Sequence, residues 1–267
     1  MAKVSIAEVD KAPVVSTPDE FAGSTETRTL FKAGKDPIQA HLNRLAAGGA
    51  MRIGPSDHDS ITYVWEGPVE VSGKRLPAGS SFIVERNAAA EVGSSGESAL
   101  LLTFSGNSET QPSPGGRIHL LPKDRLPFAN DLGHSGVAGG MHANAEEPSS
   151  VWLHENAFPP PEQVAPFDAE AGVHCHTEDE VIFVVAGTIR LGAKLYGPGT
   201  AIGIAANTYY GFTPGPDGLK FINFRPGLPS EIRMRDGRTM DEIAFWRDRL
   251  PAPEYITMEA RAEVGAQ

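Results

Sequence analysis

The sequence has only one cysteine and little positive charge. Because Cys175 is the only cysteine in the 267 residues, no internal disulfide can form and an oxidising compartment is not indicated. Lysine and arginine number 23 against 34 acidic residues, which gives a formal net charge of -11. Such an acidic surface disfavours non-specific nucleic-acid binding and adhesion to anionic membranes. We therefore expect a small-molecule substrate, with no nucleic-acid and no membrane partner.

Long apolar runs are also missing. Residues 1–15 contain no apolar run of the length that a signal peptide requires. No stretch approaches the roughly 20 apolar residues of a transmembrane helix. These absences predict a cytoplasmic protein. A chain of this length has room for two domains of ordinary size, each with its own core.

An internal repeat is the clearest positive feature of the sequence. Residues 61–92 and 181–212 align without a gap at an offset of 120. The offset brings identical residues together, among them Gly67 and Gly187, Lys74 and Lys194, Gly79 and Gly199, Asn87 and Asn207, and Phe104 and Phe224. Turn residues thus recur at fixed places between matched apolar runs, which indicates a duplicated structural unit.

Each copy of the repeat has the composition of β-strands joined by short turns. β-Branched and aromatic residues dominate the apolar runs, and glycine-containing breaks follow every 6–12 residues. We expect asparagine at the repeated position 87/207 to serve a turn that needs a left-handed residue. The predicted fold is all-β, with two barrels in tandem.

The rest of the chain completes this domain plan. The expected boundaries are an N-terminal barrel over residues 1–108, a linker with one short strand over 109–148, and a C-terminal barrel over 149–267. Residues 239–250 predict a short tail helix, because Thr239 and Glu242 have capping-box spacing and Pro251 follows. That helix is expected to pack outside the barrel, where it could also support a homodimer.

A histidine pair and a glutamate carry the predicted chemistry. His174 and His176 are two residues apart, so in a strand they point to one side and Cys175 points to the other. Glu180 follows a turn and begins the next strand, with its side chain directed back at the pair. Two imidazoles and one carboxylate form a divalent-metal site. The alternative is a polar surface turn with hydrogen-bonded histidines.

This H-x-H-x3-E-x6-G pattern resembles the first conserved motif of the cupin superfamily. Residues 199–210 occupy the place of the second motif, with Ala205, Asn207 and Tyr210 where cupins usually carry proline, glycine and histidine. Asp168 stands at the early glycine of the first motif. The resemblance covers roughly residues 45–105 and 150–226. It implies a two-domain cupin (bicupin) with jelly-roll barrels of the double-stranded β-helix type.

The resemblance also implies the metal and its ligands. One divalent transition metal per chain, iron, manganese, nickel or zinc, is expected at His174, His176 and Glu180, and Tyr210 replaces the fourth ligand. Tyr210 is then either a core tyrosine bonded to the backbone, or a metal ligand or acid/base group. In the N-terminal barrel the ligand positions carry no competent set: Gly54, Ser56, Ser60 and Ala90. That barrel is expected to be metal-free, with Asp57, His58 and Asp59 in a surface turn.

The sequence also suggests roles for other side chains around the predicted site. Phe212 is expected to contact substrate in an apolar lining with Ile182, Val184 and Ile204. Arg225 is expected at a barrel rim, either holding a substrate carboxylate or forming a surface salt bridge. We expect His134, His142 and His154 to be ordinary solvated histidines.

Three functional classes remain compatible with these residues. The favoured one is a non-haem metal dioxygenase, an oxidoreductase acting on a small aromatic or organic acid. The second is a metal-dependent isomerase, lyase or hydrolase that uses Tyr210 as its acid/base group. The third is a non-catalytic binding or storage bicupin. The fold by itself does not choose among them.

Overall fold

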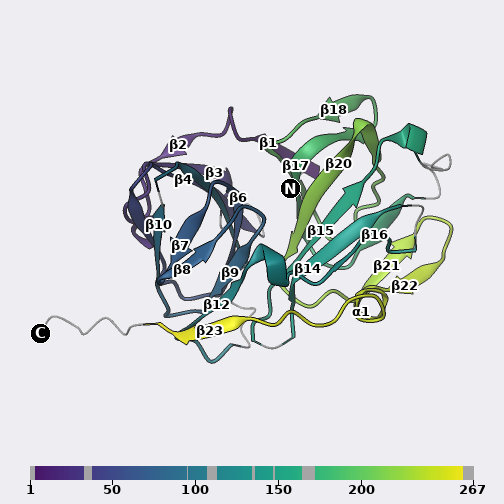
Figure 1. The fold of residues 1–267 in the computed structure, drawn as a ribbon. Helices are drawn as coiled ribbons and strands as arrows, with labels where there is room; N and C mark the ends of the chain where they lie inside the picture. The colour runs from purple at the N-terminus through teal and green to yellow at the C-terminus, as the bar shows by residue number, and fades with distance from the viewer. Residues whose placement is uncertain are drawn as a thin grey trace, which may run out of the picture. The chain divides into compact units, whose positions relative to one another are not determined.

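The computed structural model describes residues 4–32, 38–94, 96–106, 113–133, 136–146, 148–163 and 172–260. Most elements in this part of the chain are strands, and they form two compact units (Figure 1). The first barrel comprises Ala12–Leu126, Glu146–Val151 and Glu254–Gln267. The second barrel comprises Met1–Lys11, Pro127–Ala145 and Trp152–Pro253. The predicted all-β fold is confirmed.

The first barrel consists of an eight-stranded and a four-stranded antiparallel sheet. The larger sheet has the order β2 (Val14–Val15), β3 (Glu26–Phe31), β4 (Gln39–Leu45), β11 (Ala99–Ser105), β6 (Ser60–Glu66), β9 (Ser81–Val84), β12 (Arg117–Leu121) and β23 (Ile256–Glu259). The smaller sheet has the order β5 (Ala50–Ile53), β10 (Ala90–Ser94), β7 (Val69–Val71) and β8 (Lys74–Leu76). Two 3-10 turns, η1 (Asp19–Phe21) and η2 (Lys123–Arg125), also belong to this unit. Its interior is filled by apolar side chains, including Phe21, Val64, Phe82 and Leu101.

The second barrel also consists of a large and a small antiparallel sheet, but different strands lie at the sheet edges. Its large sheet has the order β1 (Val4–Glu8), β19 (Thr200–Ile204), β17 (Glu180–Leu191), β20 (Thr213–Arg225), β15 (Trp152–Phe158), β14 (Ala138–Asn144) and β13 (Phe128–Ala129), with β18 (Lys194–Tyr196) also paired to β17. A three-stranded sheet has the order β16 (His174–His176), β21 (Glu231–Met234) and β22 (Thr239–Asp241). The 3-10 turn η3 (Pro161–Gln163) and the helix α1 (Glu242–Arg247) complete the unit. No helix among the described residues is long and apolar enough to cross a membrane.

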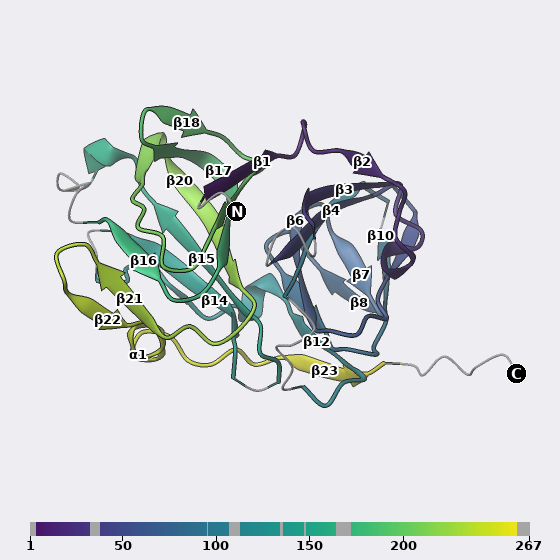
Figure 2. The same cartoon turned by 180° about the vertical axis from the view of Figure 1, so that it is seen from behind.

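The two ends of the chain each join the barrel that is distant in sequence. Strand β1 pairs with β19 of the second barrel, and β23 pairs with β12 of the first (Figures 1 and 2). Three strands, β12, β13 and β14, lie within residues 109–148, where the sequence predicts a linker with one short strand. The expected domain boundaries therefore differ from the observed ones. A strand at a sheet edge has unpaired backbone groups, and the terminal strands satisfy them here.

Backbone hydrogen bonds confirm the internal repeat. The Asn87 N–H donates to the Ser56 carbonyl at 2.8 Å, and the Asn207 N–H donates to the His176 carbonyl at 2.7 Å. Both asparagines have a left-handed backbone, with φ of 61° and 58°. Asparagine tolerates this conformation better than most residues, as the sequence predicted. The same turn therefore closes both barrels at matching positions.

A repeated glycine shows the same duplication through steric limits. Gly67 and Gly187 have φ of +72° and +66°. A Cβ atom added to Gly67 would lie 2.3 Å from the Ser98 carbonyl oxygen, and one added to Gly187 would lie 2.2 Å from that of Gly218. No larger side chain fits at either place without moving backbone. The close strand approach is thus conserved between the two copies.

The tail helix differs from its prediction. It spans Glu242–Arg247, and Asp241 caps it by accepting a hydrogen bond from the Ala244 N–H at 2.9 Å. Thr239 lies in β22, so the predicted capping box with Glu242 is wrong. The capping-box spacing was present, but Asp241 is an equally good N-cap residue and lies where the strand ends. Glu242 is consequently free to turn its side chain into the barrel, where it is 2% exposed.

Candidate metal centre

The predicted ligands are brought together by two neighbouring elements of the second barrel. His174 and His176 lie on β16, and Glu180 begins β17. Backbone hydrogen bonds of 2.9 Å run in both directions between His174 and Tyr210. The ring centroid of His174 lies 5.0 Å from that of His176 and 4.7 Å from that of Tyr210. Cys175 is 2% exposed and packs in the barrel wall, as strand alternation predicted.

The Nδ1 atoms of both imidazoles face an oxygen atom. His174 Nδ1 lies 2.8 Å from the Gly172 carbonyl oxygen, so it carries the proton and leaves Nε2 with a free lone pair. His176 Nδ1 lies 3.2 Å from the carboxylate of Glu242. Metal-binding histidines usually present one nitrogen while the other donates to a carbonyl or carboxylate. His174 has this arrangement, whereas His176 Nδ1 lies near the Glu242 carboxylate without a hydrogen bond of normal geometry.

Glu180 is a buried carboxylate that is not fully hydrogen-bonded. Its Oε2 accepts a hydrogen bond of 2.6 Å from Asn223 Nδ2 and lies 3.7 Å from His176 Nε2. Its Oε1 is buried without a hydrogen bond of normal geometry from any described residue. Burial alone would raise the pKa of Glu180, but His176 and Arg225 outweigh this effect and lower the pKa. The carboxylate is therefore ionised and has an oxygen available for a cation.

Arg225 lies among these groups and not at the barrel rim. Its side chain is 1% exposed, so both the predicted rim position and the surface salt bridge are wrong. The Nη1 atom bonds to Glu242, while Nη2 lies 3.3 Å from His176 Nε2 and 3.4 Å from Glu180 Oε2. A substrate carboxylate held side-on would have to engage terminal nitrogens that already face these partners. The strand β20 directs Arg225 inward, opposite Trp152 of β15.

Glu242 is the site residue that sequence reasoning missed. It comes from the start of α1, which lies next to β21 and β22 (Figure 1). Burial alone would raise its pKa, but Arg225 and His176 hold the pKa well below its usual range. No spacing pattern linked Glu242 to the histidines, since 66 residues of chain separate it from His176. The capping-box spacing of Thr239 and Glu242 predicted a helix-capping role for Glu242, which the structure does not show.

Tyr210 is a buried neighbour of the glutamate. It is 9% exposed, and burial together with the charge of Glu180 raises the pKa of its phenol well above the ordinary value. The phenol therefore keeps its proton at neutral pH, and its hydroxyl interacts with the Glu180 carboxylate as a hydrogen-bond donor. Its ring also joins the apolar interior, with a centroid 6.4 Å from that of Phe212. Tyr210 therefore packs in the core and lies beside His174, while its role as a metal ligand or acid/base group stays a prediction.

Aromatic side chains line the interior beside this cluster. Phe212 lies 5.5 Å from Phe221 and 5.8 Å from Phe158, measured between ring centroids. Phe212, Phe158 and Tyr196 are only partly buried where they pack on the core. The predicted apolar lining of Ile182, Val184 and Ile204 belongs to the same cluster.

Of the three histidines expected to be solvated, two are buried, so that prediction is wrong for them. His154 is 5% exposed, accepts a hydrogen bond of 2.8 Å from Trp152 Nε1, and packs 4.6 Å from Trp246 between ring centroids. Burial lowers the pKa of His154 to about 3, so the ring is neutral. His142 is fully buried, and His134 lies outside the described residues. Both side chains lie on strands of the large sheet, His142 on β14 and His154 on β15, and they face the interior of the barrel.

The donor set fits a divalent transition metal by type. It offers two imidazoles whose Nδ1 atoms face oxygen atoms, and a carboxylate with an available oxygen. The fit is incomplete in one respect, because Arg225 holds donor atoms of both His176 and Glu180. Within the described ranges, no three His, Cys, Asp or Glu side chains are gathered as a metal site. A metal would therefore have to displace the Arg225 Nη2 atom from these donors.

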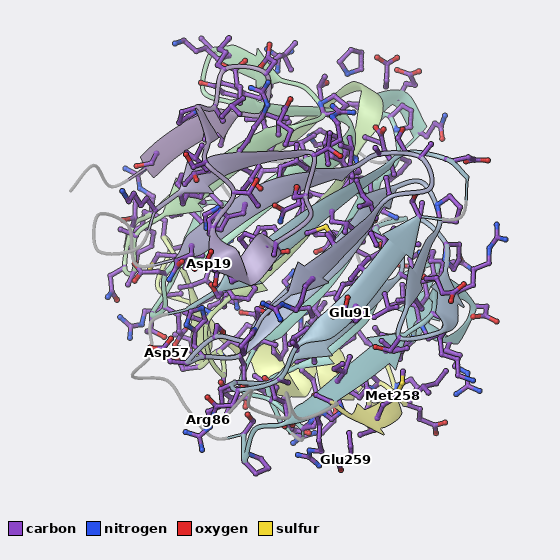
Figure 3. The ribbon with its side chains drawn as sticks, turned by 90° about the vertical axis from the view of Figure 1, so that its left-hand side faces the viewer. Asp19, Asp57, Arg86, Glu91, Met258 and Glu259 are labelled. Carbon is purple, nitrogen blue, oxygen red and sulfur yellow. The ribbon has the colours of Figure 1, made fainter. Side chains whose placement is uncertain are left out.

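The corresponding place in the first barrel has a different chemistry. Ser56 donates its hydroxyl to the His58 carbonyl at 2.6 Å, and His58 Nδ1 lies 2.6 Å from Asp57. Asp57 is exposed on this turn, and Figure 3 labels it near Arg86. Asp59 is buried and accepts hydrogen bonds of 2.7 Å from both Ser113 and Ser149. The acidic turn thus holds chain segments together and offers no set of free ligands.

We expect the first barrel to bind no transition metal. Gly54, Ser56, Ser60 and Ala90 provide at most two hydroxyl groups, which are poor ligands for Mn(II) or Zn(II). Crystals soaked in excess Mn(II) or Zn(II) should show no anomalous peak at these four positions. A peak there would contradict the assignment.

Comparison with known proteins supports the fold. No protein-family model and no curated protein sequence matches the chain significantly. The oxalate decarboxylase of Lactobacillus farciminis superimposes with a TM-score of 0.63 at 10% identity, covering 89% of this chain and 88% of that one. The chain has the two-barrel cupin fold.

Other cupin-fold structures are equally distant in sequence. A Nostoc punctiforme protein, provisionally described as a dioxygenase, has a TM-score of 0.61 at 12% identity, covering 90% of this chain and 87% of that one. The 11S allergen of Cocos nucifera has a TM-score of 0.59 at 9% identity, covering 91% of this chain and 92% of that one. At such identities the cupin likeness establishes the fold and leaves the activity to the site.

Proposed function

We propose that the second cupin barrel is the site of a metal-dependent enzyme that acts on a small organic molecule. His174, His176 and Glu180 would hold one divalent transition metal. The observation that carries this proposal is the buried, ionised Glu180 with an available oxygen, beside two imidazoles whose Nδ1 atoms face a carbonyl and a carboxylate. A buried polar atom without a hydrogen-bond partner lowers the stability of the fold, and a bound cation would supply a partner for Glu180 Oε1.

A divalent metal bound there would supply Lewis-acid or one-electron redox chemistry. The chain's own residues would do the remaining work. The Gly172 carbonyl and Glu242 orient the imidazoles. Tyr210 holds a proton next to Glu180, and the aromatic residues around Phe212 exclude water from that proton.

Within this class we favour an oxidoreductase of the dioxygenase type. Two histidines and one carboxylate with open positions are the donor set that suits non-haem Fe(II). The fold neighbour from Nostoc punctiforme is compatible with this choice. The partly buried Phe158, Tyr196 and Phe212 favour a small aromatic or otherwise apolar organic acid as substrate.

Tyr210 supports a second candidate, a metal-dependent isomerase, lyase or hydrolase. Because its phenol is protonated at neutral pH, it could act as a general acid toward a group bound beside Glu180. Metal content of protein purified without added metal discriminates between these proposals. Iron favours the dioxygenase, zinc or manganese favours the acid/base enzyme, and no metal favours a non-catalytic binding protein.

We expect elemental analysis to find one divalent metal per chain. Replacing both histidines, His174→Ala with His176→Ala, should abolish this binding because only Glu180 remains. The matched control is Cys175→Ala, since Cys175 lies between the histidines but points into the wall. The control should retain the metal. Two metals per chain, or one retained by the double variant, would contradict the assignment.

A further inference from the structure

The guanidinium of Arg225 contacts the same atoms that a metal would need. We propose that Arg225 is a built-in cation that competes with the metal for His176 and Glu180, and so weakens the metal affinity of the site. This inference rests on the proposed function, because it assigns to Arg225 a control over the same ligands. Arg225 is here a positioning residue.

The contacts of Arg225 define the competition. Its Nη2 atom lies 3.3 Å from His176 Nε2 and 3.4 Å from Glu180 Oε2. His176 faces Glu242 through Nδ1, so Nε2 is the nitrogen left for a metal. A guanidinium hydrogen directed at Nε2 uses the only lone pair of that atom. A metal and the Arg225 Nη2 atom therefore cannot both occupy this position.

Arg225 also cannot withdraw easily. Its side chain is 1% exposed, and its Nη1 atom bonds to Glu242, which α1 holds at 2% exposure. Arginine does not lose its proton in proteins, so the positive charge persists. Metal entry thus requires the Nη2 end of the side chain to move while a buried ion pair holds the Nη1 end.

The net charge of the buried cluster of Arg225, Glu180 and Glu242 also disfavours a bound metal. Two carboxylates, Glu180 and Glu242, pair with the single guanidinium of Arg225, so the ion-paired cluster has one more negative than positive group. A divalent metal without Arg225 would make this set neutral, whereas a metal with Arg225 would leave it positive. Uncompensated charge is costly inside a protein, because the local dielectric constant is low. Arg225 consequently stabilises the metal-free site and disfavours the loaded one.

The test is titration of metal-stripped, full-length protein with Mn(II) and with Zn(II), measured by calorimetry or chelator competition. Arg225→Gln should bind these metals about tenfold more tightly than the wild type, the lower end of effects reported for residues that contact metal ligands. Because that change removes the guanidinium that pairs with Glu242, a second variant combines Arg225→Gln with Glu242→Gln, so that the charged pair is removed together. Glu242 also faces His176 Nδ1, so the double variant is compared with Glu242→Gln alone. It should bind metal more tightly than that single variant.

The matched control is the exposed pair of Arg238 and Asp236, joined at 2.8 Å. The variant with Arg238→Gln and Asp236→Asn should have wild-type metal affinity. If the wild type binds metal, and neither Arg225→Gln nor the double variant binds it more tightly than its reference protein (the wild type and Glu242→Gln, respectively), Arg225 does not compete and only this inference fails. If the wild type binds no metal but an Arg225 variant does, the inference stands and the metal-dependent function fails. If none of the proteins binds metal, both fail.

Discussion

Replacing Glu242 by alanine is expected to lower the free energy of unfolding by about 3–5 kcal/mol, the usual cost of breaking a buried ion pair. Glu242 is 2% exposed, and it pairs with Arg225 while facing His176 Nδ1 at 3.2 Å. Without Glu242 the Arg225 guanidinium stays buried with only Glu180 at 3.4 Å as a charged partner. Urea denaturation followed by tryptophan fluorescence measures the loss. Trp152 and Trp246 report on the second barrel, so the variants are compared in a Trp65→Phe background.

Two controls separate this pair from ordinary surface electrostatics. Asp236→Ala breaks an exposed pair with Arg238 and should leave the urea midpoint unchanged. Glu242→Gln keeps a hydrogen-bond acceptor and should cost less than Glu242→Ala. An unchanged midpoint for Glu242→Ala would show that the ion pair does not stabilise the second barrel.

The pH dependence has a defined sign. The folded-state pKa of Glu242 is lowered, so its stabilising contribution is present above the unfolded value of about 4.3 and is lost as the pH falls below it. The difference between the wild type and Glu242→Ala should therefore shrink below about pH 4.

Replacing Tyr210 by phenylalanine is expected to lower turnover about 100-fold or more, the scale of losing a general acid/base group. The substitution keeps the ring and its buried area, so the thermal midpoint should change little. It removes the hydroxyl that faces Glu180 and that the raised pKa keeps protonated. The measurement is kcat with a substrate identified by screening small aromatic and organic acids.

Metal affinity supplies a readout that needs no substrate. Tyr210→His places an imidazole next to His174, whose backbone pairs with residue 210 through two 2.9 Å hydrogen bonds. We expect this variant to bind Zn(II) or Mn(II) at least as tightly as the wild type. Phe212→Leu is a matched control for the hydrophobic cluster, because it changes an aromatic neighbour 6.4 Å from Tyr210 and adds no ligand. Unchanged turnover and unchanged metal affinity in Tyr210→Phe would assign Tyr210 to core packing alone.

Local sequence pattern was sufficient for the strands and turns. The repeat at an offset of 120 predicted equivalent turns, and Asn87 and Asn207 adopt left-handed backbones of φ 61° and 58° there. Strand alternation correctly separated Cys175 from the histidines on either side. These features depend on residues close in the chain, whose backbone preferences and side-chain period the sequence contains directly.

Strand exchange and the tail helix could not be predicted in the same way. Strand β1 completes the sheet of the barrel whose other strands begin more than 100 residues later, and β23 joins the first barrel. Any short apolar strand can pair with a free sheet edge, so composition alone does not name the partner. At the tail helix, two caps were available in sequence, and the end of β22 at Asp241 decided between them.

By itself the sequence determined that this protein is a duplicated all-β chain, and that its second copy carries His174 and His176 on one strand with Glu180 at the start of the next. Only the tertiary structure decided what surrounds these residues. It buries Arg225 between Glu180 and Glu242, and it places Tyr210 beside His174. The physical reason is that charge compensation acts through space. A buried carboxylate is stabilised by whichever cation the fold brings near it, and no spacing along the chain encodes that encounter.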